Sequence, residues 1–290
     1  MKMSKSNRSQ VWWTSTALLA LLSGLDGCVL QGGSVPLSTA DDEAVAADTS
    51  QGLSSYTHEY AWELNRPSRR MLRSRDSVCF LTGIHGTFRG KADLAKISNV
   101  RGYWYVTGVS SQPDFGATAR CFKYDLAKVI PTQFNESSAG GEDLDLGAHR
   151  LCALSRVSGD FESEADVVKV YLASDGHWFL QTTATSSGVN GGAICLDDDP
   201  ATPFRTSRIA DVAAGDTQVI AFNLVPNEIK KTEPLKGPAC FLTRMTGKFS
   251  GKGGASVQTF VAPTANGTWN YYLRAAGSEP GVASSGVCAQ

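Results

Sequence analysis

Alternation of apolar and polar residues with a period of two predicts short β-strands along most of this chain. Tryptophan begins three such stretches, at Trp104, Trp178 and Trp269, and another large apolar residue follows each of them two positions later. Residues 166–171 are rich in β-branched side chains and favour a further strand. No helical period is evident after the N-terminal segment. We therefore expect an all-β protein.

Three stretches of the sequence repeat one another. Each begins with a cysteine, continues through Gly-x-Phe to Gly-x-Trp, and ends at a second cysteine; the copies span residues 79–121, 152–195 and 240–288. The residues that recur are mostly cysteines, glycines and apolar side chains, so the repeat describes a scaffold. Its large apolar members are expected in the core: Phe88, Phe161, Phe249, Trp104, Trp178 and Trp269.

Six of the seven cysteines belong to this pattern. A small all-β unit buries little apolar surface, and a disulfide that closes a loop of roughly 45 residues would stabilise it by about 4 kcal/mol. Six cysteines allow 15 pairings, but the nearly equal spacings favour pairing within each copy. We expect three bonds in an oxidising compartment, namely Cys79 with Cys121, Cys152 with Cys195, and Cys240 with Cys288.

The spacing within each repeat also breaks the period of two. Leucine stands two residues after the first cysteine and another apolar residue stands five after it, so we expect a β-bulge near Gly83, Arg156 and Arg244. The linkers share an Ala-Gly step followed by a short apolar alternation, which predicts a strand before each cysteine-bounded core. Together these features predict three tandem disulfide-stapled antiparallel β units of about four to five short strands each. The units span residues 51–122, 123–196 and 197–290.

Two arrangements of the three units fit the pattern. The units can form separate packed modules in a row, or they can form one pseudo-threefold assembly with a shared core. The two linkers between the repeats differ in length. That difference favours packed modules.

The N-terminal segment has the features of an export signal. Basic residues precede an apolar run at residues 11–25, which is shorter than the roughly 20 residues needed to span a bilayer. The run ends in Leu25-Asp26-Gly27-Cys28, which resembles the lipobox of bacterial lipoproteins. This resemblance implies a signal peptide at residues 1–27 and lipidation of Cys28. A more distant cleavage site at residues 44–46 is the alternative.

Two further observations agree with a lipid anchor. Cys28 is the one cysteine outside the repeats, and a thioether-linked lipid would account for it. Residues 28–55 contain no aromatic residue and are expected to be a disordered tether. Val29, rather than aspartate, follows the cysteine, and by the same resemblance this implies the outer membrane of the cell envelope.

The distribution of charge argues against nucleic acid as a partner and identifies one arginine-rich segment. The formal net charge of -1 gives no excess of Lys and Arg for nucleic acid. Arginines nevertheless cluster in residues 66–75, and Arg69, Arg70 and Arg73 are candidates for contact with lipid headgroups or an anionic polymer. The alternative is a solvated loop or short helix whose arginines pair with nearby acids. We favour this alternative.

Motifs of catalysis and cofactor binding are absent from the sequence. It contains no Gly-x-Ser-x-Gly elbow, no Walker-type phosphate loop and no His-Glu-x-x-His, and its four histidines are not spaced as a metal pair. Asp197, Asp198 and Asp199 are weak candidates for a calcium site, with a solvated loop as the favoured interpretation. We expect no cofactor and no enzymatic activity.

Aromatic residues leave binding as the expected class of function. Tyr103, Tyr105 and Phe179 occupy the strand face opposite the tryptophans, where they could stack on sugar rings or be buried between units, and we favour burial. We expect an exported, membrane-anchored protein with a binding or envelope-structural role, and glycan or another surface polymer as the ligand class. The alternative is an envelope or secreted hydrolase with a site on the inter-repeat linkers.

Overall fold

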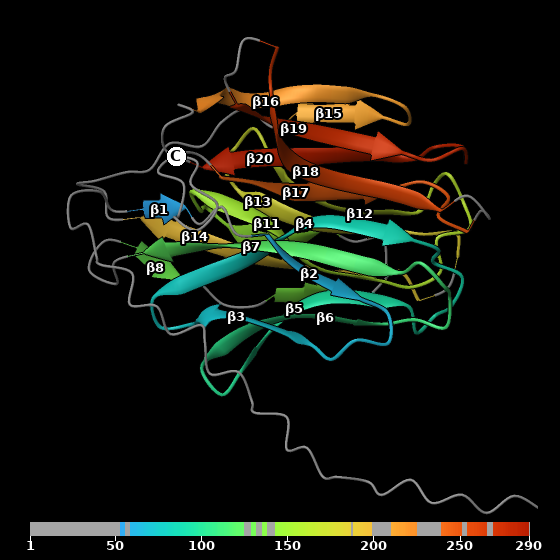
Figure 1. Ribbon diagram of the computed structural model, residues 1–290, viewed down its shortest axis with the longest axis horizontal. Coiled ribbons are helices and arrows are strands. Elements are labelled where there is room, and N and C mark those ends of the chain that lie inside the picture. The colour runs from blue at the N-terminus through green and yellow to red at the C-terminus, as the bar shows by residue number, and fades with distance from the viewer. Residues whose placement is uncertain are drawn as a thin grey trace, which may run out of the picture. The chain divides into compact units, whose positions relative to one another are not determined.

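The computed structural model describes residues 53–55, 59–124, 129–131, 135–137, 143–186, 188–198, 210–224, 239–250, 254–265 and 269–289. Residues Asp48–Gln290 form one compact unit. The described part of the unit consists of antiparallel β-strands joined by turns and contains no helix, which confirms the all-β prediction (Figure 1). Within these residues there is accordingly no helix that is long and apolar enough to cross a membrane.

Each repeat contributes two strands that carry the cysteines and a middle pair between them. In the first repeat the cysteine strands are β4 (Ser77–Gly86) and β7 (Gly116–Tyr124), and the middle pair is β5 (Leu94–Val100) and β6 (Tyr103–Val109). The second repeat has the cysteine strands β11 (Leu151–Ser158) and β14 (Asn190–Asp198) and the middle pair β12 (Val167–Leu172) and β13 (Trp178–Thr183). The third has the cysteine strands β17 (Ala239–Thr246) and β20 (Ala283–Ala289) and the middle pair β18 (Ala255–Pro263) and β19 (Trp269–Ala276).

Short strands precede each repeat, as the alternation in the linkers predicted. They are β1 (Leu53–Ser55), β2 (Tyr60–Glu63) and β3 (Arg69–Arg73) before the first repeat, β8 (Val129–Pro131), β9 (Asn135–Ser137) and β10 (Leu144–Gly147) before the second, and β15 (Ala210–Ala213) and β16 (Thr217–Leu224) before the third. The arginine-rich segment was expected to be a loop or short helix. That expectation is wrong for residues 69–73, which form β3 because the apolar Met71 packs inward between exposed arginines.

Each of the three sheets combines strands of two repeats. The cysteine strands of the second repeat continue the middle pair of the first, in the order β3-β6-β5-β11-β14-β8. In the same way the third repeat continues the second, in the order β10-β13-β12-β17-β20-β15, and the first continues the third, in the order β1-β7-β4-β18-β19-β16. The exchange of strands is therefore cyclic. Figure 1 shows its last step, in which β18 of the third repeat lies beside β4 of the first, with β19 on the far side of β18.

Three equivalent phenylalanines meet where the repeats converge. Phe88, Phe161 and Phe249 are fully buried, and their ring centroids are 5.4 to 6.2 Å apart. Their backbones form a closed cycle of hydrogen bonds, from the amide of Phe88 to the carbonyl of Phe249 (2.9 Å), from Phe249 to Phe161 (2.8 Å) and from Phe161 to Phe88 (3.3 Å). One core cluster includes buried residues from all three repeats.

Of the two arrangements that the sequence leaves open, the protein thus adopts the pseudo-threefold one. Linker length was a poor guide because the linkers supply edge strands such as β10 and β16, which can be reached over different lengths of chain without disturbing the core. The ranges 51–122, 123–196 and 197–290 remain a description of the sequence repeats.

The predicted disulfides and bulges are both confirmed. Cys79 is bonded to Cys121, Cys152 to Cys195 and Cys240 to Cys288, and the two cysteines of each bond lie directly opposite each other in register. The register shifts once in each first cysteine strand, at Thr82, Ser155 and Thr243. These three polar residues are buried.

The indole nitrogens of the buried tryptophans are hydrogen-bonded to the backbone. The Trp104 Nε1 atom donates to the carbonyl of Ser77 (2.7 Å), and the Trp178 Nε1 atom donates to the carbonyl of His149 (2.8 Å). Both side chains are almost fully buried. The Trp269 side chain lies outside the described residues.

Candidate functional site

Several residues singled out in the sequence lie outside the described part of the chain. They are Cys28, Asp199 and the side chain of Asp198. Asp197 is described, and its carboxylate lies 3.0 Å from the Nδ1 atom of His149. Across the described ranges, no group of three His, Cys, Asp or Glu residues could hold a metal ion.

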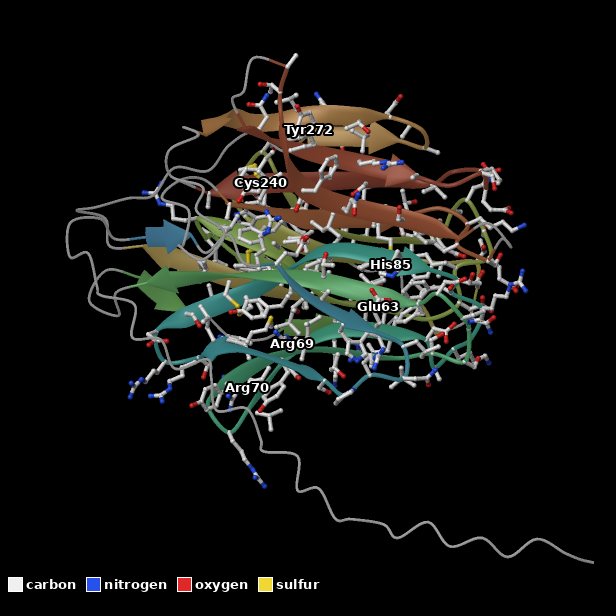
Figure 2. All side chains as sticks on the ribbon, in the orientation of Figure 1. Glu63, Arg69, Arg70, His85, Cys240 and Tyr272 are labelled. Atoms are coloured by element: carbon white, nitrogen blue, oxygen red, sulfur yellow. A yellow bond between two sulfur atoms is a disulfide. The ribbon has the colours of Figure 1, made fainter. Side chains whose placement is uncertain are left out.

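An exposed strip of arginines lies along β3, at the edge of its sheet. The guanidinium groups of Arg70 and Arg73 lie over the Tyr103 ring, 5.0 and 5.6 Å from its centroid, and the Arg73 Nε atom donates a 3.1 Å hydrogen bond to the Tyr103 hydroxyl. Figure 2 labels Arg69 and Arg70 on this strand. We refer to Arg69, Arg70 and Arg73 as the arginine strip.

Local structure explains how the strip forms. Met71 is buried, with its Sδ atom 3.9 Å from the Cys121 Sγ atom, so its neighbour Arg70 points outward. The register between β3 and β6 shifts between Arg70 and Arg73, which allows both arginines to reach the same ring of Tyr103.

The arginines of the strip were expected to pair with nearby acids. That expectation is wrong among the described side chains, where no carboxylate lies within 4.0 Å of these three guanidinium groups. The strip therefore presents three cations to solvent, none of which forms an ion pair with an acid of the described part.

Aromatic residues form stacked pairs on the outer faces of two other sheets. Tyr171 and Phe179 stack with centroids 5.5 Å apart, and Phe260 and Tyr272 stack with centroids 5.4 Å apart. These residues, together with Tyr103 and Tyr105, are partly exposed rather than buried between units. The favoured expectation of burial is therefore not met.

Polar groups surround the first of these pairs. The Lys169 ammonium lies 4.5 Å from the centroid of the Tyr171 ring, and the Tyr171 hydroxyl donates a hydrogen bond to the Asp143 carboxylate. This bond, with a smaller contribution from desolvation, raises the pKa of Tyr171 to about 12. Nearby, the Gly147 amide and the His177 side chain lower the pKa of Asp145.

A cleft with a volume of about 840 Å³ opens at the end of the sheet that contains β4, β7, β18 and β19. Turns from the first and third repeats form its walls. Residues that line the cleft include His85, Arg89, Asp114, Ala255, Ser256 and Ser278.

A carboxylate and an imidazole are paired at the edge of this cleft. The Nε2 atom of His85 lies 3.2 Å from the Oε2 atom of Glu63. Both residues are labelled in Figure 2. Gly116 of β7 lies opposite Glu63 of β2 on one side and opposite His85 of β4 on the other. A Cβ atom at Gly116 would be 2.5 Å from the Cε1 atom of His85 and 2.6 Å from the Oε2 atom of Glu63. The pair therefore depends on this glycine. On the other side, Ser256 lies opposite His85.

Sequence reasoning identified the arginine strip but missed the Glu63–His85 pair and the cleft. The available signal was His85 itself, because the second and third repeats have Ser158 and Thr246 at the equivalent position. Comparison with protein-family models, with curated proteins and with solved structures finds no match to this chain.

Proposed function

We propose that this protein is an exported, lipid-anchored binding protein of the bacterial envelope that holds an anionic surface glycan on its arginine strip. The observation that carries the proposal is the geometry of the strip: three exposed guanidinium groups, of which those of Arg70 and Arg73 lie over the Tyr103 ring, with no carboxylate of the described residues within 4.0 Å. The three arginines are carried by β3, a strand of the sheet.

Arginine suits this ligand class for a physical reason. The planar guanidinium presents donors in a fixed fork that matches phosphate and carboxylate groups, and it remains charged at any physiological pH. Contact with the Tyr103 ring restricts Arg70 and Arg73, so less side-chain entropy is lost when an anion binds. Tyr103 also offers a partly exposed ring beside the charges, where a sugar can pack.

Export and anchoring are supported by the sequence and by the three disulfides, which are compatible with an oxidising compartment. Cys28 is the proposed lipidation site. Cys28→Ser should move the protein from the membrane fraction to the soluble fraction. If the variant stays in the membrane fraction, the lipid anchor is wrong.

The binding proposal is tested with purified lipopolysaccharide, which carries phosphates and sugar carboxylates, in a Cys28→Ser background so that no lipid anchor contributes. Replacing Arg69, Arg70 and Arg73 with glutamine should weaken binding about 10-fold to 100-fold, since each exposed ionic contact is worth up to about 1 kcal/mol. Binding by the unchanged strip should also weaken at high salt.

A matched control removes the same amount of charge elsewhere. Replacing Lys91, Lys169 and Arg274, none of which lies in the sheet of the strip, with glutamine should leave the affinity within about twofold, because long-range effects of exposed charges are screened. Equal binding by the two triple variants would contradict the proposal. Charges on an edge strand also discourage pairing with other chains; a strip variant that aggregates but binds normally would assign the arginines to that role instead.

A hydrolase remains the second candidate, and the Glu63–His85 pair is the observation that favours it. An imidazole beside a carboxylate can act as a general base, and here the pair borders a cleft. The residues involved lie on β2 and in the first repeat rather than on the inter-repeat linkers. Hydrolysis of p-nitrophenyl esters that is lost in His85→Gln would support this candidate. Equal rates for the two proteins would remove it.

A further inference from the structure

The first and second repeats have equivalent turns after their central phenylalanines, and each of these two turns contains a buried aspartate. Asp93 stands five residues after Phe88 and is 2% exposed. Asp166 stands five residues after Phe161 and is fully buried. The backbone fixes their equivalence, because the carbonyls of Asp93 and Asp166 accept hydrogen bonds from the equivalent glycines Gly159 (2.9 Å) and Gly247 (3.0 Å).

Both carboxylates are held by hydrogen-bond donors of the surrounding turns. The Oδ1 atom of Asp166 accepts from the amides of Thr185 (2.9 Å) and Ser186 (3.3 Å), and its Oδ2 atom accepts from the Ser163 amide (2.9 Å) and the Ser186 hydroxyl (2.8 Å). The Asp93 Oδ2 atom accepts from the amides of Arg89 (2.8 Å) and Gly90 (2.9 Å). These turns are therefore built around a carboxylate.

The third repeat has no carboxylate at the equivalent position. The glycine equivalent to Gly159 and Gly247 is Gly86, and its partner in register is Ala255. Ala255 is 4% exposed, so an alanine occupies the buried position that aspartate holds twice elsewhere. The cleft of about 840 Å³ opens at this position, with Ala255 in its wall.

Donors remain on the walls of the cleft. The register of β12 with β13 and of β18 with β19 places Ser278 where the second repeat has Thr185, whose amide holds Asp166. Arg89 reaches the cleft from the turn after Phe88, and its Nε atom donates to the Ser250 carbonyl at 2.5 Å. This contact fixes the guanidinium and leaves its two terminal nitrogens with no acceptor among the described residues.

We propose that this cleft binds a sugar acid, whose carboxylate occupies the position taken by the carboxylates of Asp93 and Asp166 in the first and second repeats. Arg89 and Ser278 would hold the carboxylate. Asp114, Ser256 and His85, which also line the cleft, are hydrogen-bonding partners for hydroxyl groups, and they favour a hydroxylated acid over a simple fatty or amino acid. The cleft is separate from the arginine strip, so the inference does not depend on the proposed polymer binding.

The test uses D-glucuronate as the probe and D-glucose as the uncharged control, with binding followed by calorimetry or by amide chemical shifts. A monosaccharide acid offers few atoms, so a dissociation constant in the millimolar range is expected, with glucose at least tenfold weaker. Ala255→Asp is the decisive variant because it supplies the missing carboxylate from the protein itself. It should abolish glucuronate binding and leave the melting temperature equal or higher.

Two further variants complete the experiment. Arg89→Gln should weaken glucuronate binding about tenfold without loss of fold, because Arg89 is exposed. The glutamine triple variant of the arginine strip should bind glucuronate as the unchanged protein does, which separates this inference from the polymer proposal. The inference is overturned if glucuronate does not bind, if glucose binds equally well, or if a folded Ala255→Asp protein retains full affinity.

Discussion

The backbone amide of Phe88 donates a 2.9 Å hydrogen bond to the carbonyl of Phe249, which joins the first repeat to the last. Because Phe161 completes the same cycle, each repeat needs the other two to satisfy these backbone groups and to bury its phenylalanine. The exchange of strands between sheets has the same consequence, since every middle pair is continued by the cysteine strands of another repeat.

We therefore predict that the three repeats unfold together. Phe161→Ala, which removes one of the central rings, should lower the free energy of unfolding by about 3 to 5 kcal/mol. Denaturation followed by tryptophan fluorescence and by far-UV circular dichroism should give one coincident transition. Val219→Ala, at a site 51% exposed, is the control and should change stability by less than about 0.5 kcal/mol. Separate transitions for different probes would contradict a shared core.

A second prediction concerns one disulfide. Replacing Cys152 and Cys195 with alanine opens a loop with a sequence separation of 43, and the chain-entropy relation gives a loss of about 4 kcal/mol in the free energy of unfolding. Guanidinium denaturation measures the loss, and mapping of non-reduced peptides verifies that Cys79–Cys121 and Cys240–Cys288 remain bonded. An unchanged transition midpoint would show that this bond does not stabilise the fold.

Local features of the fold could be predicted from the sequence, but the exchange of strands could not. The bulges at Thr82, Ser155 and Thr243 follow from the spacing of apolar residues within single strands, and the disulfides follow from the similar spacings of the three cysteine pairs. A middle pair can join the cysteine strands of its own repeat or those of the next repeat. In both arrangements the same face of each strand is buried. Alternation of apolar and polar residues therefore cannot distinguish the two arrangements.

The candidate sites also differ in how far the sequence alone predicts them. The arginine strip is visible as a local run of charge, although its contact with Tyr103 depends on the register of β3 with β6. The Glu63–His85 pair forms across β7, where Gly116 leaves room between the two side chains. The contact between Glu63 and His85 needs a glycine on β7, a third strand. Such a requirement produces no pattern in the local sequence of β2 or β4.

The buried aspartates give a third prediction, because they differ in what they hold together. Asp166 bonds its own turn and also the turn that contains Thr185 and Ser186, whereas the bonds described for Asp93 lie within its own turn. Asp166→Ala should therefore lower the free energy of unfolding by about 3 kcal/mol and Asp93→Ala by less, since unpaired buried donors cost about 1 to 3 kcal/mol.

Thermal or guanidinium denaturation of both aspartate variants provides this comparison. Glu162→Ala, at an exposed position beside Phe161, is the control for changes in net charge and should have little effect. A larger loss for Asp93→Ala than for Asp166→Ala would show that the bonds between turns are not what makes the aspartate important.

The last prediction follows from the bond between Tyr171 and Asp143. Only the neutral hydroxyl can donate to the carboxylate, so the bond favours the protonated tyrosine and raises the pKa of Tyr171 from 10.0 to about 12. A pKa that is higher in the folded than in the unfolded protein gives a stabilisation that is complete below about pH 10. That stabilisation is lost as the pH rises through about 12.

Absorbance at 295 nm, taken as the difference between the protein and its Tyr171→Phe variant, isolates this titration from the other tyrosines. Asp143→Asn should lower the pKa of Tyr171 toward 10.0, because it removes both the charged acceptor and its electrostatic contribution. Asp175→Asn should lower the pKa much less, since Asp175 acts on Tyr171 only through a weaker charge interaction. If the two substitutions shift the titration equally, the elevated pKa reflects the general negative charge of this surface and not the hydrogen bond to Asp143.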